Sequence, residues 1–281
     1  MPEGPVVHIG YPKAASSFLQ KVVFPQVAHY EYIPDGPRLR DLSKRYWFEY
    51  EANNGCQLDF DQPLILSREH LTSPVRSMLK QENAEHRDMA VANLIHFFKD
   101  RGTILIVLRR QDSLVESLVR FKSSFFHKDH ALFLDFLAED SWARLFHRAG
   151  AMLMQSFDFC ALVSQLAAAL GQERIKLLLY EDLANRPADF LAQLGEVFEQ
   201  DLGHLLEATQ TPVNASVKMA RLRSPLAAAL NRRVDGRLEG LLPDQEVRLP
   251  DDTRRRLLDI YAPGNERLFR WFGLENRYGY Y

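Results

Sequence analysis

The sequence predicts an α/β fold in which helices flank a parallel β-sheet. Short apolar runs alternate with helical patterns along most of the chain, the order that parallel strands with crossover helices produce. One of these runs, Ile104–Leu108, is apolar at every position, which is typical of a parallel strand buried on both faces. The chain is 46% hydrophobic and 26% charged, which is ordinary for a soluble globular protein. We expect a single domain over residues 1–281, with loop excursions at about 26–62 and 201–250.

The individual elements follow from these patterns in chain order. Apolar runs bounded by turn signals predict four strands, at Val6–Gly10, Pro63–Ser67, Thr103–Leu108 and Arg174–Tyr180. Helical patterns predict helices at Ser16–Phe24, Val75–Phe98, Ser113–Phe126 and Ala188–Glu199, with two more within 131–170. A last helix is expected to begin at Pro250-Asp251-Asp252-Thr253, which is a good helix-start signature. We expect Pro263-Gly264 to break this helix in the middle.

A candidate phosphate-binding loop follows the first strand. Backbone N–H groups at the start of the next helix point at an anion in such loops, and side chains add charge and hydrogen bonds. The loop residues are Lys13, Ala14, Ala15, Ser16 and Ser17, followed by Phe18. In the Walker A motif the lysine ends the loop directly before Ser or Thr, whereas Lys13 comes early here. We therefore predict a P-loop-like parallel sheet with a cradle unlike Walker A; an ordinary strand–turn–helix corner is the alternative.

A second candidate phosphate site follows the strand Thr103–Leu108. Arg109 stands at the carboxyl edge of the predicted sheet, where α/β sheets bind ligands, and Ser117 follows on the first turns of the next helix. An arginine fork and a helix-borne hydroxyl group suit a second, separate phosphate. The alternative is that Arg109 caps a loop and Ser117 lies on a helix surface.

Together the two segments resemble the nucleotide-binding motifs of sulfotransferases that use 3′-phosphoadenosine 5′-phosphosulfate (PAPS). That family usually has Pro-Lys-x-Gly-Thr-Thr in its first loop, where this chain has Pro12-Lys13-Ala14-Ala15-Ser16-Ser17. In the second segment Leu108-Arg109 and Ser117 match the family, while Arg110-Gln111 replace Asn-Pro. The methyl group of Ala15 costs little if the backbone there is helical, so we expect this departure to be mild. The resemblance is to soluble bacterial members of the carbohydrate type.

The resemblance implies a set of residues that contact the nucleotide. They are Lys13, Ala14, Ala15, Ser16, Ser17 and Phe18 at the 5′-phosphosulfate, Arg109 and Ser117 at the 3′-phosphate, Tyr180 against the nucleotide, and Lys218 and Arg221 in a late loop that closes over it. For Tyr180 the alternative is a core tyrosine. The next two residues, Glu181 and Asp182, are expected to cap the following turn.

Sulfuryl transfer needs a base to take the acceptor proton and cations to hold the charge that develops. Lys13, at the mouth of the loop, can serve the oxygen of the leaving group. Members of the family carry a glutamate or a histidine at the end of the neighbouring strand, where Glu69 and His70 are adjacent in this chain. The family's glutamate position falls on the apolar Ile65 when the segments are aligned. We favour Glu69 as the base and keep His70 as the other candidate.

Composition and charge limit the cofactors and partners. A net charge of −2 offers no electrostatic support for general nucleic-acid binding. The two cysteines and nine histidines show no metal-ligand spacing, so we expect no metal and read His8 as a satisfied core residue. We find no signal-peptide pattern and no apolar run of the roughly 18–20 residues that span a bilayer, so we expect no membrane span and a cytoplasmic enzyme. The oligomeric state stays open.

The predicted activity is transfer of a sulfuryl group from PAPS to a hydroxyl or amine of a small-molecule or glycan acceptor. A P-loop kinase for a small metabolite is the first alternative. Kinases hold Mg²⁺ with an acidic residue that usually stands at a strand end, whereas the strand ending at Leu108 is followed by two arginines. The second alternative is a non-catalytic nucleotide-binding protein that has the cradle and lacks the base.

Overall fold

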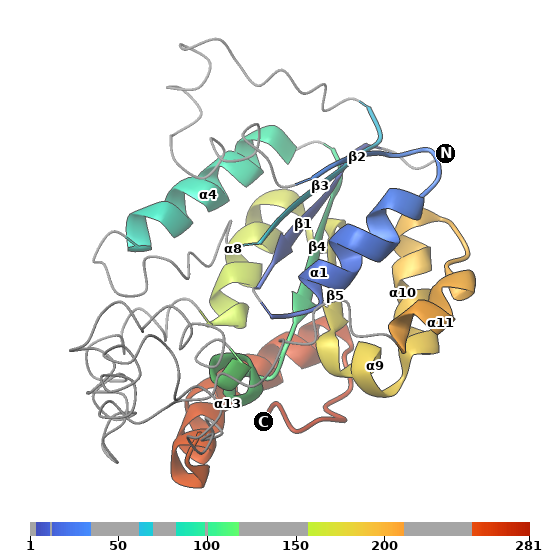
Figure 1. Ribbon diagram of the computed structural model, residues 1–281. Helices are drawn as coiled ribbons and strands as arrows, with labels where there is room; N and C mark the ends of the chain where they lie inside the picture. Colours follow the sequence, from blue (N-terminus) through green and yellow to red (C-terminus); the bar gives the residue numbers. More distant parts are fainter. Residues whose placement is uncertain are drawn as a thin grey trace, which may run out of the picture.

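The structure is a computed structural model that describes residues 4–11, 13–34, 62–69, 83–98, 101–117, 157–210 and 249–281. Its centre is a five-stranded sheet with the strand order β2-β3-β1-β4-β5, in which all four neighbouring pairs are parallel (Figure 1). The strands are β1 (Val6–Gly10), β2 (Glu31–Ile33), β3 (Leu64–Glu69), β4 (Thr103–Leu108) and β5 (Ile175–Leu179). The predicted fold class, a parallel sheet flanked by helices, is therefore confirmed.

Helices occupy most of the described chain between and after the strands. The longer ones are α4 (Asn83–Phe98), α8 (Phe159–Leu170), α10 (Pro187–Phe198) and α13 (Asp251–Phe272). The short ones are α1 (Ser16–Phe18), the π-helical η1 (Leu19–Val23), the 3₁₀ turns η2 (Phe24–Gln26), η5 (Gln172–Arg174) and η6 (Gly203–Leu205), and α9 (Tyr180–Asn185) and α11 (Leu206–Thr209). Among the described residues, every helix is too short or too polar to cross a lipid bilayer.

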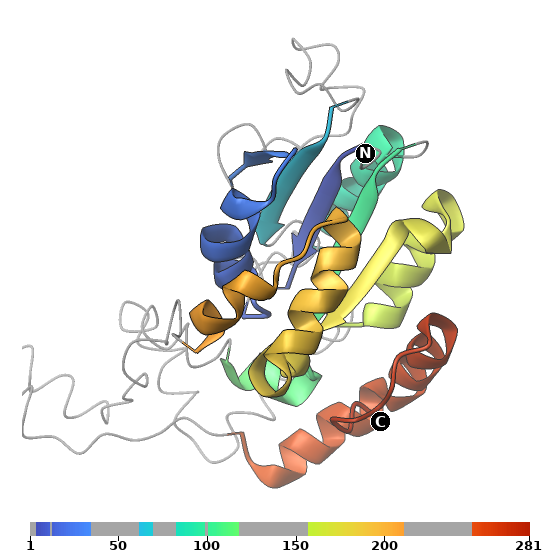
Figure 2. The ribbon, with the colours of Figure 1, turned by 90° about the vertical axis from the view of Figure 1, so that its right-hand side faces the viewer.

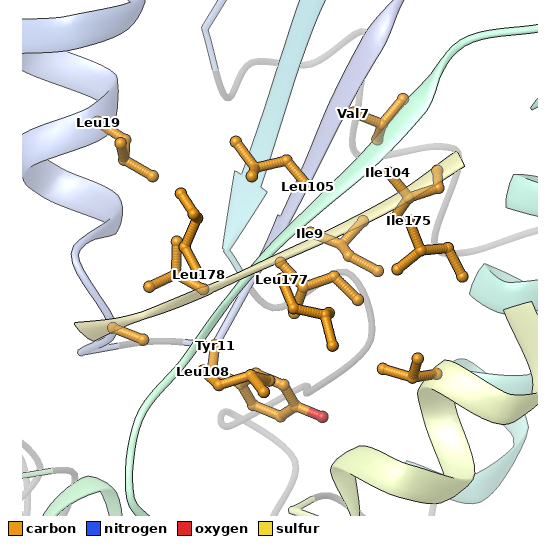
Figure 3. Packing of buried hydrophobic residues seen from close by; sticks show 14 of the residues in the cluster. Val7, Ile9, Tyr11, Leu19, Ile104, Leu105, Leu108, Ile175, Leu177 and Leu178 are labelled. Carbon is orange, nitrogen blue, oxygen red and sulfur yellow. The ribbon is translucent and has the colours of Figure 1, made fainter. Parts of the chain in front are cut away.

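Strand register and side-chain alternation together assign the core residues to the two faces of the sheet. Ile104 of β4 pairs with Ile175 of β5, so both side chains lie on one face. Leu105 is one position after Ile104, and Leu178 is three positions after Ile175. Both therefore lie on the opposite face, toward Leu19 (Figure 3). Because both faces are covered, β4 is buried at every position after its first residue, as its apolar sequence predicts.

The covering helices form one layer on each face of the sheet (Figure 2). The α1–η1 segment and α10 cover one face, and the rings of Phe24 and Phe198 meet there at 6.1 Å. The opposite face carries α8, against which α4 and α13 pack. Tyr11, directly after β1, contacts this second layer through the ring of Phe159 at 4.7 Å. The sheet edge that follows β1 is thus fixed between two helical layers.

The sequence analysis missed β2, which lies within the excursion expected at 26–62. This strand has only three residues, Glu31-Tyr32-Ile33, and among the described strands it pairs with β3 alone. Only Ile33 is buried, so the segment lacks the apolar run that identified the other strands. The remainder of this excursion, 35–61, lies outside the described residues. The single-domain organisation stays a prediction.

The expected break at Pro263-Gly264 was wrong, because α13 continues through both residues. Proline removes only one hydrogen bond from the helix, the one its own N–H would make. Leu257 and Tyr261 before it and Leu268 after it are buried, so both halves of the helix pack against the rest of the fold. Gly264 lets the helix approach α8 closely, since a Cβ built there would lie 3.3 Å from Cys160 Cβ.

The other helices and strands differ from their predicted bounds in smaller ways. The helix expected at Ser16–Phe24 is split into α1, the π-turn η1 and the 3₁₀ turn η2. Tyr180, expected to end a strand, instead begins α9. The helix expected from Ser113 already starts at Gln111 and is described to Ser117. The rest of that helix, residues 75–82 and most of 131–170 lie outside the described residues.

Candidate functional site

The parallel register brings four chain segments to one edge of the sheet. Gly10, the last residue of β1, pairs with Glu69 of β3. Leu108 at the end of β4 pairs with Leu179 at the end of β5. The residues that follow, Arg109 and Tyr180, therefore leave the sheet side by side. The phosphate loop and Arg109 were predicted to share this edge, and the structure brings them into direct contact.

The loop after β1 is tightly wound. The N–H of Ala14 donates to the Tyr11 carbonyl at 3.1 Å, and the Ala15 carbonyl accepts from the N–H groups of Phe18 and Leu19 at 2.9 and 3.0 Å. The Ser16 hydroxyl is buried and donates to the Tyr11 carbonyl at 3.3 Å. These bonds close the turn from strand to helix and direct the chain from β1 into α1.

Two residues of this loop have left-handed backbones, Lys13 with φ 69° and Ala15 with φ 63°. The expectation that Ala15 is helical, and that its methyl group therefore costs little, was wrong. An L-residue in this region brings its Cβ too close to the carbonyl oxygen, which costs roughly 1–2 kcal/mol. The glycine found at this position in the sulfotransferase pattern is thus the residue that the local backbone favours.

An Ala15→Gly variant is therefore expected to gain up to about 1 kcal/mol of unfolding free energy, since the released strain exceeds the roughly 0.5–1 kcal/mol that glycine loses in chain entropy. Urea unfolding measures this difference. Ala14→Gly is the matched control, because Ala14 is buried and its φ is negative, so this variant should lose stability. Equal losses in the two variants would contradict the strain at Ala15.

A buried polar chain lies beneath the loop. His8 Nδ1 is 2.8 Å from the Ser67 hydroxyl, which also accepts a bond from Gln20 Nε2 at 3.1 Å. The ring of Phe24 packs edge-on against His8 at 5.5 Å. His8 Nε2 has no hydrogen-bond partner among the described residues. His8 is thus a core histidine as predicted, but it is only half satisfied, and burial lowers its pKa to about 3.

Gly10 sits where this buried chain meets the loop. A Cβ built on Gly10 would lie 2.7 Å from His8 Cε1 and 2.7 Å from Ser16 Oγ. Real Cβ atoms do not approach other heavy atoms so closely. The end of β1 therefore requires glycine because the imidazole and the hydroxyl converge on it from two sides.

Arg109 connects the loop to the neighbouring strand ends. Its Nη1 donates to the Lys13 carbonyl at 2.7 Å, and its Nε donates to the Ser113 hydroxyl at 3.1 Å. The guanidinium carbon lies 4.3 Å from the centre of the Tyr180 ring, in cation–π contact. Among the described residues no carboxylate pairs with Arg109. Within the part of the chain that the structure describes, its charge has no acidic partner and its Nη2 makes no hydrogen bond.

Arg110, the next residue, belongs to an ion-pair network instead. Arg110 Nε and Arg254 Nη1 contact the two oxygens of the Asp112 carboxylate at 2.7 and 3.1 Å. Burial alone would raise the pKa of Asp112, but the bonds from Arg110 outweigh it and lower the pKa. Arg254 also pairs with Glu116. This network fixes the start of α13 beside the helix that follows Arg109.

The predicted site residues have three outcomes. The structure brings Lys13, Arg109 and Tyr180 together, with Ser113 as a partner of Arg109 that the sequence analysis missed. Ser117 is described as a half-buried helical residue with no contact to this group. Glu69 is described only through its backbone, beside Gly10, and His70, Lys218 and Arg221 lie outside the described residues. The described residues contain no cluster of three or more His, Cys, Asp or Glu that could hold a metal ion.

Comparison with solved structures finds nine chains with a similar fold, among them a bacterial sulfotransferase. The fold is similar to that of a sulfotransferase from Alicyclobacillus acidocaldarius, with a TM-score of 0.54, 12% sequence identity and 96% of each chain covered. No protein-family model matches this chain, and no curated protein matches it. At this level of identity the likeness shows a shared fold along nearly the whole chain.

Proposed function

We propose that this chain is a PAPS-dependent sulfotransferase that transfers a sulfuryl group to a hydroxyl or amine. The observation that carries the proposal is the contact between Arg109 and the phosphate loop. Arg109 lies half-buried at the sheet edge, contacts the Lys13 carbonyl, and has no acidic partner among the described residues. A positive charge held next to a phosphate-type loop suits a ligand with two separate anionic groups.

The described residues fit such a ligand in two parts. The loop from Lys13 to Phe18 would hold the 5′-phosphosulfate, with Lys13 and Ser17 at its mouth. Arg109 would hold the 3′-phosphate, and the Tyr180 ring beside it would lie against the adenine. In the reaction the bridging S–O bond breaks as the acceptor atom bonds to sulfur, and the acceptor proton passes to a base. Glu69 and His70 remain the candidates for that base, and Lys13 for the cation at the leaving oxygen.

Two carboxylates that bind Arg110, the residue after Arg109, favour this reaction over phosphoryl transfer from a magnesium nucleotide. Asp112 accepts from two arginines, and Glu181 accepts from the Arg110 N–H and from Tyr280. Both carboxylates are therefore already engaged by donors, whereas kinases present a carboxylate to Mg²⁺. Sulfuryl transfer also places less charge in the site and needs cationic donors such as Lys13 and Arg109.

Thermal unfolding with 3′-phosphoadenosine 5′-phosphate, and separately with ATP and Mg²⁺, tests this proposal. We expect the bisphosphate alone to stabilise the fold, by about 2.7 kcal/mol at 100 times its dissociation constant. A larger shift with ATP and Mg²⁺ would favour a kinase. A shift with the bisphosphate but no sulfated product from any acceptor series would favour the non-catalytic alternative.

An Arg109→Ala variant tests whether Arg109 itself binds the bisphosphate. This variant should lose most of the thermal stabilisation by 3′-phosphoadenosine 5′-phosphate. It removes the guanidinium charge, which has no acidic partner among the described residues. Arg270→Ala is the matched control, since Arg270 lies on α13 with 77% of its side chain exposed. Loss of the shift in both variants would indicate a general effect of charge and would remove Arg109 from the site.

A further inference from the structure

Two tyrosines in the segment after α13 reach back to the strand end that carries Tyr180. The Tyr280 hydroxyl donates to Glu181 Oε2 at 2.7 Å, and the Tyr278 hydroxyl donates to Asp182 Oδ1 at 2.7 Å. Glu181 and Asp182 were expected to cap a turn. The structure shows instead that these two carboxylates accept phenol hydroxyls from a segment almost one hundred residues further along the chain.

The same segment, 278–280, also contacts the end of the strand that precedes Arg109. The second oxygen of Glu181 accepts the N–H of Arg110 at 3.0 Å, so one carboxylate joins Tyr280 to the residue after Arg109. Arg110 Nη1 donates to the carbonyl of Tyr278 at 2.8 Å. Arg109 and Tyr180, the cation–π pair, are therefore each followed in sequence by a residue bound to 278–280.

The segment can act as a fixed support because it is itself anchored. The side chain of Tyr280 is buried, and its ring lies 4.8 Å from that of Phe269 on α13. The Tyr280 carbonyl accepts from Asn265 Nδ2 at 2.9 Å, and Asn265 exchanges two further bonds with Gln111. Gly279 has φ 69°, and this left-handed turn between the two tyrosines lets both reach the same motif.

Both phenols stay protonated donors at any ordinary pH. Burial, followed by the charge of Glu181, raises the pKa of Tyr280 well above its usual value. Burial and the bond to Asp182 raise the pKa of Tyr278 to about 12. Each tyrosine therefore gives its carboxylate a hydrogen bond that does not titrate away under working conditions.

We infer that the 278–280 segment belongs to the nucleotide site as a positioning element, with Tyr280 holding Glu181 and thereby setting the mutual placement of Arg109 and Tyr180. This inference rests on the proposed function. Its specific consequence concerns one end of the ligand. Arg109 and Tyr180 would bind the 3′-phosphate and adenine, whereas the loop at Lys13 would bind the 5′ group without help from Tyr280.

The test compares binding of 3′-phosphoadenosine 5′-phosphate and adenosine 5′-phosphate to the full chain by calorimetry. Tyr280→Phe keeps the ring and removes only the hydroxyl. We expect its affinity for the bisphosphate to fall about tenfold, the scale of losing one hydrogen bond. The affinity for adenosine 5′-phosphate should fall by less than half as much on a logarithmic scale. The variant should therefore prefer the bisphosphate over adenosine 5′-phosphate less strongly than the unaltered chain does.

Controls separate this inference from a general loosening of the fold. Tyr281→Phe, at the exposed residue directly after this segment, should leave both affinities unchanged. If Tyr280→Phe does not fold, Tyr278→Phe removes the neighbouring bond to Asp182 from a more exposed ring and should weaken the same preference for the bisphosphate. An equal loss for both ligands would overturn the positioning role. Failure of the unaltered chain to bind either ligand would instead contradict the proposed function.

Discussion

A Gly10→Ala variant is expected to lose roughly 1–3 kcal/mol of unfolding free energy, the usual cost of forcing an extra methyl group into a packed core. It should also lose nucleotide binding. The new Cβ would meet His8 Cε1 and Ser16 Oγ, each at 2.7 Å. His8 is buried in the sheet and bonded to Ser67, so it cannot retreat without breaking that bond. Ser16 would have to move, and with it the start of the phosphate loop.

Urea unfolding and the thermal shift with 3′-phosphoadenosine 5′-phosphate measure the two losses. The matched comparison is a double-mutant cycle with His8→Ala, which removes the ring that the new methyl group would strike. Gly10→Ala should destabilise this background by clearly less than it destabilises the unaltered protein. If its cost were the same in both backgrounds, the contact between residues 8 and 10 would not be the cause.

The second large effect concerns pH. Burial keeps His8 neutral in the folded protein, with its pKa lowered to about 3, while the unfolded chain has an ordinary histidine. Below pH 6.5 unfolding therefore takes up a proton at this residue, and acid favours the unfolded state. His8 should lower the free energy of unfolding by about 2 kcal/mol between pH 8 and pH 5, and the loss continues until the pH reaches the folded-state pKa.

A His8→Asn variant should lack this contribution. Urea unfolding at pH 8, 7, 6 and 5 gives the pH dependence for both proteins, and the difference between them isolates His8 from the other histidines. Burial is the cause of the lowered pKa, and the described groups that bond or stack with His8, Ser67 and Phe24, carry no charge. Parallel pH dependences in the two proteins would show that folding does not lower the pKa of His8.

Much of this architecture follows from local sequence. The strands β1, β3, β4 and β5 were predictable because each contains a short apolar run. In β4 the run from Ile104 to Leu108 is unbroken, as burial on both faces of the sheet demands. Parallel strands place Arg109 and the loop at Lys13 at the same edge of the sheet. The strand order that makes β1 and β4 neighbours comes from the structure. Tyr180 was named as a nucleotide contact from the resemblance to sulfotransferases, with a core tyrosine as the alternative. That role stays a prediction, and Tyr180 begins a helix rather than ending a strand.

Other features depend on interactions that local sequence does not contain. The left-handed backbone at Ala15 results from the closure of the loop, and an alanine gives no sign of it. The carboxylates of Glu181 and Asp182 looked like turn caps because their partners, Tyr280 and Tyr278, are remote in sequence. The three residues of β2 gain their strand geometry from β3 alone. Glu69 and His70 remain candidates for the base on sequence grounds.

The bond between Glu181 and Tyr280 also has a consequence for the order of biosynthesis. The two residues are 99 positions apart, so at 5–20 residues per second Tyr280 is added about 5–20 s after Glu181. In that interval the sheet strands and the loop at Lys13 have already been made. A nascent chain therefore carries the 5′ half of the proposed site before the 3′ half can be set in place, and full nucleotide affinity should arise only once 278–280 has been synthesised.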